Sequence, residues 1–144
     1  MKLLILNGPN LNMLGIREPE IYGKETYEDL CRYLEEAAIN LNVDIVIKQS
    51  NHEGELVDWI QESRLYFEGI ILNAAAYTHT SIAILDALKA VALPTVEVHL
   101  SDIDQRESYR KHSYIREACV ASFYGKGFES YKEAVVYLEG ESKR

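Results

Sequence analysis

Residues 3–23, LLILNGPNLNMLGIREPEIYG, join a short apolar run to a long polar loop. The run at residues 3–6 has the length and composition of a buried strand, and the loop leaves its carboxyl end. A connection of about 17 residues is far longer than the usual two to six between a strand and a helix, and such loops are commonly lids or binding loops. Ligands of open α/β sheets bind at the carboxyl ends of the strands, so this loop is the first candidate for a functional site.

The second half of the loop carries a single cation, Arg17, five positions before Tyr22. A tyrosine acts as a general base only as phenolate, which is scarce at neutral pH because the ordinary pKa is about 10. A guanidinium nearby lowers that pKa. The alternative is a surface loop in which Arg17 pairs with Glu18 or Glu20 while Tyr22 packs against the rim of the sheet.

Strands and helices alternate along the rest of the chain. This alternation implies right-handed βαβ units and a parallel sheet covered on both faces. The pattern predicts one α/β domain over residues 1–144, a flavodoxin-like three-layer sandwich whose five parallel strands have the order 2-1-3-4-5, with residues 140–144 as a flexible tail. The later strands are expected at residues 43–47, 70–73, 95–99 and 118–124. The first two helices are expected at 27–41, after a Thr26 cap, and at 55–65. The third helix is expected to run from a cap at Thr78 or Thr80 to about residue 90, and the last from residue 126 or 128 to 138.

Helical spacing places several apolar side chains on the inner faces of these helices, Leu65 and Ile82 among them. Cys31 falls on the same kind of stripe in the first helix, which favours a core thiol. Cys31 and Cys119 are far apart and match no metal or redox spacing.

Composition limits the classes of partner. The chain has 144 residues, 47% hydrophobic and 26% charged, with a net charge of -8. This charge argues against a nucleic-acid partner, which requires a basic face, and it means that an anionic substrate needs a local cluster of Arg and His. The apolar runs are strand-sized and no secretory leader is evident, so we expect no membrane association and a cytoplasmic location.

Polar residues stand at the tips of the strands that this topology brings together. Asn10 follows the first strand, Asn73 ends the third, and Glu97 and His99 end the fourth. Residues two apart on a strand face the same side with Cα atoms roughly 6.6 Å apart, so Glu97 can reach the imidazole. A carboxylate raises the pKa of a neighbouring histidine and orients its ring, which makes His99 a candidate general acid. A purely structural Glu97–His99 pair is the alternative.

Other polar residues near these tips each have an ordinary explanation. His79 precedes a predicted helix, and alone it would be a solvated loop histidine. Backbone N–H groups at Leu100 and the Ser101 hydroxyl suit a carboxylate. A lone Arg110 is usually solvated, and Asp86 is expected to pair with Lys89 on an exposed helix face. The remaining histidines are expected to order a loop (His52) and to be solvated (His112).

Taken together and in order, these motifs resemble the type II 3-dehydroquinate dehydratases of the shikimate pathway. The resemblance covers almost the whole chain and rests on NGPNLN at 7–12, LG at 14–15, REP at 17–19, YG at 22–23, SNHEG at 50–54, NAAAYTHTS at 73–81, EVHLS at 97–101, RE at 106–107 and Arg110.

The resemblance implies a role for each candidate residue. The reaction would be an anti elimination through an enolate, converting 3-dehydroquinate to 3-dehydroshikimate. Tyr22 would be the base, activated by Arg17, and His99, oriented by Glu97, would be the acid, with Asn10 helping to hold the water that stabilises the enolate oxygen. Asn73, Leu100 and Ser101 would hold the substrate carboxylate and a nearby hydroxyl, while His79, Arg110 and Asp86 would contact ring hydroxyls.

The resemblance also implies no metal or other cofactor, and a homo-oligomer built as a tetramer of trimers, a dodecamer, in which Asp86 reaches a neighbouring subunit. Three features depart from the family pattern. Ala74 stands where Pro is common and Asp102 where Asn is usual, and the segment at residues 119–127 is atypical. We expect that segment to bear on the fifth strand and on assembly more than on chemistry.

Two other classes with this predicted fold compete. A nucleotide- or flavin-binding domain is disfavoured because the first loop has Pro9, Leu11 and Met13 in place of a phosphate cradle. A receiver-type signalling domain requires an acidic metal-binding cluster where this chain has amides.

Overall fold

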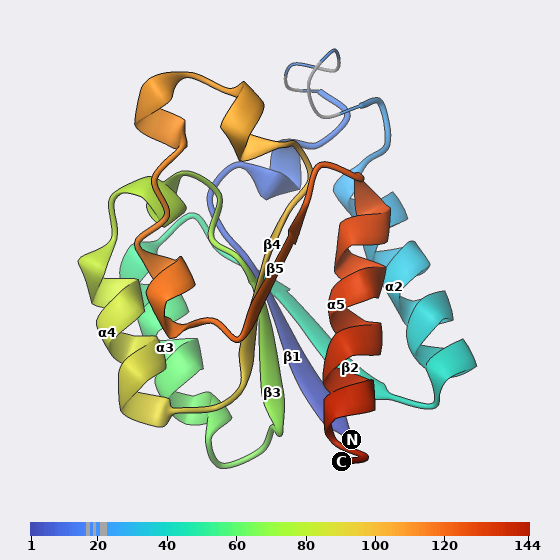
Figure 1. Cartoon of the computed structure of the whole chain (residues 1–144). Helices are drawn as coiled ribbons and strands as arrows, with labels where there is room; N and C mark the ends of the chain where they lie inside the picture. The colour runs from blue at the N-terminus through green and yellow to red at the C-terminus, as the bar shows by residue number, and fades with distance from the viewer. Residues whose placement is uncertain (17, 19, 21–22) are drawn as a thin grey trace.

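The computed structural model describes residues 1–16, 18, 20 and 23–144. Within this part of the chain, one sheet of five parallel strands has the order β2-β1-β3-β4-β5, with helices on both of its faces (Figure 1). The predicted fold and strand order are therefore confirmed. The strands are β1 Lys2–Asn7, β2 Asp44–Gln49, β3 Gly69–Asn73, β4 Thr95–His99 and β5 Ala121–Tyr124. The α-helices of the described residues are α2 Tyr27–Leu41, α3 Glu53–Ser63, α4 Ile82–Val91 and α5 Phe128–Glu141. The 3-10 helices are η1 Leu11–Met13, η2 Ala75–His79, η3 Ile103–Gln105, η4 Ser108–Arg110 and η5 Ile115–Ala118.

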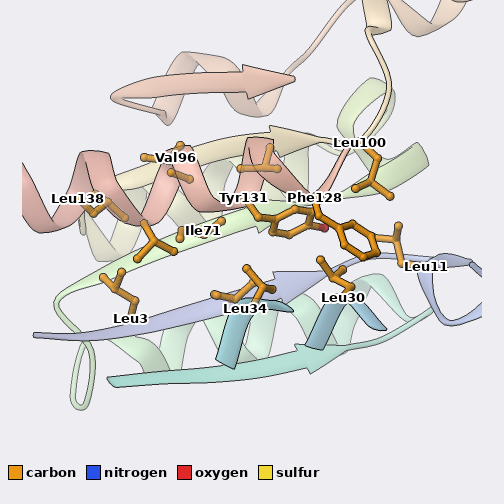
Figure 2. Packing of buried hydrophobic residues seen from close by; sticks show 14 of the residues in the cluster. Leu3, Leu11, Leu30, Leu34, Ile71, Val96, Leu100, Phe128, Tyr131 and Leu138 are labelled. Atoms are coloured by element: carbon orange, nitrogen blue, oxygen red, sulfur yellow. The ribbon is translucent and has the colours of Figure 1, made fainter. Parts of the chain in front are cut away.

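The sheet divides the hydrophobic core into two layers. Successive residues of a strand point to opposite faces, so Leu3 and Ile5 of β1 pack with α2 and α5, whereas Leu4 and Leu6 pack with α3 and α4. Figure 2 shows the first of these layers, where Tyr131 of α5 lies among the aliphatic side chains. Both faces of β1 and β3 are covered, which explains why these strands are apolar throughout.

Helix ends follow local hydrogen bonds. Thr26 forms a capping box with Asp29, in which each side chain accepts a hydrogen bond from the other residue's backbone N–H. The cap of α4 is Ser81, whose Oγ accepts from Ile84 N at 2.9 Å, so the predicted caps Thr78 and Thr80 were wrong. Helix α5 ends at Glu141, which extends it beyond the predicted 138 and into the segment expected to be a flexible tail.

Two predicted inner positions were also wrong. Leu65 lies beyond the end of α3 and is 64% exposed, and Ile82 is the first residue of α4 and is 55% exposed. Helical periodicity misplaces both because it does not show at which residue a helix begins or ends. Cys31 is half-buried on α2 rather than enclosed in the core. Among the described residues, no helix is long and apolar enough to cross a bilayer.

Parallel pairing aligns the carboxyl ends of the central strands. Asn7 of β1 is in register with Gln49 of β2 and with Asn73 of β3. On the other side of β3, Leu72 is in register with Glu97, which lies two residues before His99 on β4. The polar tips that the sequence predicted to meet therefore stand beside one another.

Candidate active site

A pocket opens at the carboxyl ends of β1, β3 and β4. The described residues that line it include four side chains able to carry positive charge and no Asp or Glu, so the pocket suits an anion although the net charge of the chain is -8. Its lining consists of Pro9, Asn10, Leu11, Met13, Leu14, Asn73, Ala75, Ala76, His79, His99, Leu100, Ser101, Ile103, Arg106 and Arg110.

The floor of the pocket depends on a close approach between the β1 and β3 tips. Gly8 N–H donates to the Asn73 carbonyl at 2.8 Å. A Cβ atom on Gly8 would lie 2.4 Å from the Ala74 carbonyl oxygen, so only glycine fits. Ala74 is fully buried in this contact. Beyond Gly8 the chain turns at Asn10, which has φ 70° and whose backbone N–H donates to Asn51 Oδ1 at 2.9 Å.

Two asparagine side chains beneath the pocket are held by one phenol. Tyr131 Oη donates to Asn7 Oδ1 at 2.6 Å and accepts from Asn73 Nδ2 at 2.8 Å. Asn73 Oδ1 accepts from Ala75 N at 3.1 Å, so both ends of this amide are fixed. One Nδ2 hydrogen remains to point at a bound molecule.

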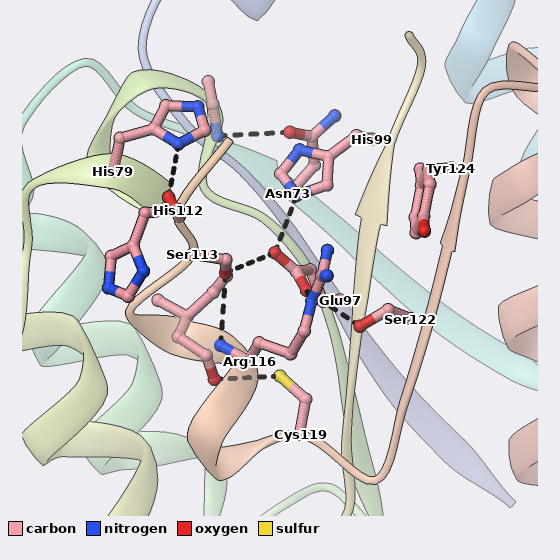
Figure 3. A network of polar contacts seen from close by, with 12 residues as sticks. Asn73, His79, Glu97, His99, His112, Ser113, Arg116, Cys119, Ser122 and Tyr124 are labelled. Atoms are coloured by element: carbon pink, nitrogen blue, oxygen red, sulfur yellow. Dashed lines mark hydrogen bonds and ion pairs between the residues drawn. The ribbon is translucent and has the colours of Figure 1, made fainter. Parts of the chain in front are cut away.

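His99 and Glu97 form the predicted pair. His99 Nε2 lies 2.7 Å from Glu97 Oε2, and the Glu97 side chain is completely buried. Because Nε2 faces the carboxylate, Nδ1 is the ring nitrogen available to a molecule in the pocket. Figure 3 shows the pair beside β4, with a dashed line from the His99 ring to the carboxylate below it.

Glu97 is the centre of a larger network. Its Oε2 accepts from Ser113 Oγ at 2.6 Å, and its Oε1 accepts from Arg116 Nε at 2.7 Å and from Ser122 Oγ at 2.8 Å (Figure 3). Burial opposes ionisation of this carboxyl, but the hydrogen bonds from His99, Ser113 and Arg116 outweigh it and lower its pKa to about 2. Glu97 is therefore ionised at neutral pH.

His79 is oriented by a backbone acceptor. Its Nδ1 lies 2.7 Å from the His112 carbonyl oxygen, which requires a hydrogen on Nδ1. Burial, followed by the positive charges of His99 and Arg110, lowers the pKa of His79, although the bond to His112 opposes this. In the neutral ring, Nε2 is an acceptor suited to a hydroxyl group.

The segment after β4 supplies two arginines to the pocket. Arg106 Nη1 donates to Ser101 Oγ at 3.4 Å, and Arg110 Nε lies 3.0 Å from Glu107 Oε2. The carboxylate of Asp102, one of the departures from the family pattern, caps η3 by accepting from Asp104 N at 2.9 Å. That interaction gives the side chain a local structural role.

The structure brings together most of the predicted site residues. Asn10, Asn73, His79, His99, Leu100, Ser101 and Arg110 all line the pocket, and Glu97 supports His99 from behind. Asp86 does not line it and lies on the exposed face of α4; there Lys89 pairs with Glu117 at 2.8 Å in place of the expected Asp86 pair. Arg17 and Tyr22 fall outside the described residues. No group of three metal-binding side chains is present in the part of the chain that the structure describes.

Sequence reasoning missed the residues that support the site from a distance. Arg116 and Ser122 reach Glu97 from η5 and β5, and Tyr131 reaches Asn73 from α5. Ser122 belongs to the segment expected to concern assembly more than chemistry, yet its hydroxyl contacts Glu97. A Ser in the strand expected after the one that carries Glu97 is the only signal that the sequence offered.

Comparison with known proteins gives one consistent result. A family model described as "Dehydroquinase class II" matches residues 1–139. The 3-dehydroquinate dehydratase of Clostridium acetobutylicum is 46% identical over 139 residues, covering 96% of both chains. That of Fusobacterium nucleatum is 52% identical over 141 residues, again covering 96% of both.

Solved structures agree. The type II dehydroquinase from Butyrivibrio crossotus matches with a TM-score of 0.94 at 44% identity, covering 96% of this chain and 97% of that chain. The type II dehydroquinase from Propionibacterium acnes matches with a TM-score of 0.93 at 37% identity, covering 96% of each. The fold, the pocket and these matches lead to one conclusion: the chain belongs to the class II dehydroquinase family, the type II 3-dehydroquinate dehydratases.

Proposed function

We propose that this chain dehydrates 3-dehydroquinate to 3-dehydroshikimate by anti elimination through an enolate, without a metal or other cofactor. Membership of the family supports the reaction. The observation that carries the chemistry is the buried contact of 2.7 Å between Glu97 and His99. His99 lines a pocket whose other polar residues include amides and basic side chains.

His99 is the general acid of this proposal. Ionised Glu97 lies 2.7 Å from the ring and holds it in one orientation. The proton passes from His99 to the departing hydroxyl, which leaves as water. A proton donor positioned in this way typically accelerates a reaction about a hundred- to ten-thousandfold.

Tyr22 is the base, and it removes a proton from the carbon next to the substrate ketone. This assignment rests on the sequence motif, as does the role of Arg17 in lowering the pKa of the Tyr22 phenol. The resulting enolate oxygen faces a water molecule held in part by Asn10. The left-handed conformation of Asn10 supports its role, because it directs this turn of the chain over the pocket.

The remaining pocket residues bind the substrate. The substrate carboxylate and a nearby hydroxyl meet Asn73, Leu100 and Ser101. His79 and Arg110 contact ring hydroxyls; the acceptor nitrogen of neutral His79 supports this.

We further propose that the chain assembles as a tetramer of trimers, in which Asp86 enters the pocket of a neighbouring subunit. The exposed position of Asp86 on α4, away from its own pocket, supports this. Sedimentation velocity tests it: a dodecamer or a trimer is expected, and a fully active monomer would contradict it.

The reaction is tested by following conjugated enone product spectrophotometrically as purified protein acts on 3-dehydroquinate, with and without a chelator. Equal rates in both conditions are expected. Absence of product would overturn the proposal, and inactivation by chelator would contradict its metal-free mechanism.

A further inference from the structure

The two oxygens of Glu97 face different partners. Oε2 accepts from His99 and Ser113, whereas Oε1 accepts from Ser122 and from Arg116 Nε at 2.7 Å. Arg116 is therefore a second basic residue on the same buried carboxylate, and it is not one of the residues that line the pocket (Figure 3). Neither the motifs of the site nor the proposed reaction gives this arginine a role.

Arg116 is held so that its charge is directed at Glu97. Its guanidinium carbon lies 5.4 Å from the centre of the Tyr124 ring, within the range of a cation–π contact. Its Nη2 atom is buried and has no hydrogen-bond partner among the residues that the structure describes. The bond to Glu97 and the Tyr124 ring are thus its main restraints, and the carboxylate raises the pKa of the Arg116 guanidinium although burial opposes this.

A carboxylate that is buried without compensation holds the proton of a neighbouring imidazolium strongly, because opposite charges attract more in a medium of low dielectric constant. A general acid that is held too strongly transfers its proton slowly. We propose that Arg116 is a positioning residue that acts on His99 through Glu97, offsetting the carboxylate's charge so that the imidazolium releases its proton to the leaving hydroxyl. This inference rests on the proposed role of His99 as the acid.

Position alone does not require Arg116. Ser113 and Ser122 hold one carboxylate oxygen each, at 2.6 Å and 2.8 Å, and both remain if the arginine is removed. Removing the charge of Arg116 should therefore leave Glu97 in place and change what His99 experiences. The other described titratable groups around the Glu97–His99 pair and Arg116 are His79, Arg106, Arg110, Cys119, Tyr124 and Asp104.

The test compares Arg116→Gln, Arg116→Lys and a control, Arg32→Gln, which removes an arginine from an exposed pair with Asp29 on α2. The His99 ring is titrated by NMR in the unliganded protein, and its signal is identified by its loss in His99→Asn. In Arg116→Gln the titration midpoint should rise by about one pH unit, and kcat should fall about threefold at unchanged KM. Arg116→Lys and Arg32→Gln should stay close to wild type.

An unchanged midpoint in Arg116→Gln would overturn the inference, and a lower midpoint would show instead that Arg116 merely braces Glu97.

If Arg116→Gln does not fold, the double variant Glu97→Gln/Arg116→Gln, which removes both charges, is compared with Glu97→Gln. Equal kcat in these two proteins supports action through Glu97, and a further loss in the double variant contradicts it. Because the NMR titration uses no substrate, it also separates this inference from the proposed reaction: a rise in the midpoint in a protein without dehydratase activity would refute only the latter.

Discussion

Tyr131 Oη accepts a hydrogen bond from Asn73 Nδ2 at 2.8 Å, across 58 positions of sequence. The bond joins the last helix to the tip of β3, beneath the pocket. Since Tyr131 also donates to Asn7, one hydroxyl fixes polar groups on two neighbouring strands. The orientation of the Asn73 amide in the pocket therefore depends on a residue that does not line it.

Replacing this hydroxyl tests that dependence. Tyr131→Phe leaves a buried acceptor on Asn7 and a buried donor on Asn73 without their partner, which should cost about 1–3 kcal/mol of unfolding free energy. KM should rise severalfold because the Asn73 amide is then held only through its Oδ1, by Ala75 N. Urea unfolding and steady-state kinetics measure the two effects, and Tyr66→Phe, at a tyrosine that is 67% exposed, is the control. Wild-type KM in Tyr131→Phe would show that Asn73 keeps its orientation without the phenol.

Gly8→Ala should disturb the pocket through the backbone. The new methyl group would meet the Ala74 carbonyl at 2.4 Å, so the β1 and β3 tips must separate. Overpacking of this kind typically costs about 1–3 kcal/mol, and kcat/KM should fall at least tenfold as the turn at Asn10 shifts. The matched control is Gly54→Ala in α3, where the added Cβ meets nothing within 4 Å. That change should be neutral or stabilising by up to about 1 kcal/mol; equal effects of the two changes would contradict the steric explanation.

Tyr22→Phe should abolish turnover and leave ligand binding largely intact. Loss of a positioned base typically lowers the rate about a hundred- to ten-thousandfold, and more where no other group replaces it. Calorimetric titration with the reaction product measures binding independently of turnover, and Tyr66→Phe serves again as the control. A variant that retains near wild-type kcat would exclude Tyr22 as the base.

Acid should destabilise the fold through Glu97. Its pKa is lowered from 4.5 to about 2 in the folded chain, so the ionised carboxylate contributes stability that is complete above pH 4.5 and is lost as the pH falls toward 2. In Glu97→Gln the melting temperature should therefore depend less on pH within this window. Glu62→Gln, at an exposed position on α3, should retain the wild-type slope. Parallel curves for wild type and Glu97→Gln would contradict this assignment.

The strand order could be predicted because apolar runs alternate with helical patterns, and right-handed parallel connections leave few arrangements. Thr26 also marked the start of α2 correctly, through a capping box with Asp29. The Ser81 cap was missed because Thr78, Thr80 and Ser81 are equally suitable caps by sequence. Only the tertiary structure decides which of the three stands where α4 begins.

The site was predictable where chemistry and topology coincide. Glu97 and His99 share one face of one strand, so their contact follows from a periodicity of two. The partnership of Arg116 with Glu97 spans 19 positions and depends on how η5 packs against α4 and β4. No local pattern encodes such packing, and the same holds for the contact between Tyr131 and Asn73.

The central place of β1 also bears on how the chain is made. Its neighbours are residues 44–49 and 69–73, so β1 leaves the ribosome before either of its partners and must wait for both. During that delay an apolar segment has two open edges, the condition in which nascent chains aggregate or recruit chaperones. The bond from Tyr131 to Asn7 forms only after residue 131 has been translated, so the floor of the pocket cannot exist before then. We therefore expect truncated chains that end before α5 to be recovered bound to chaperones, and catalytic competence to appear only after release.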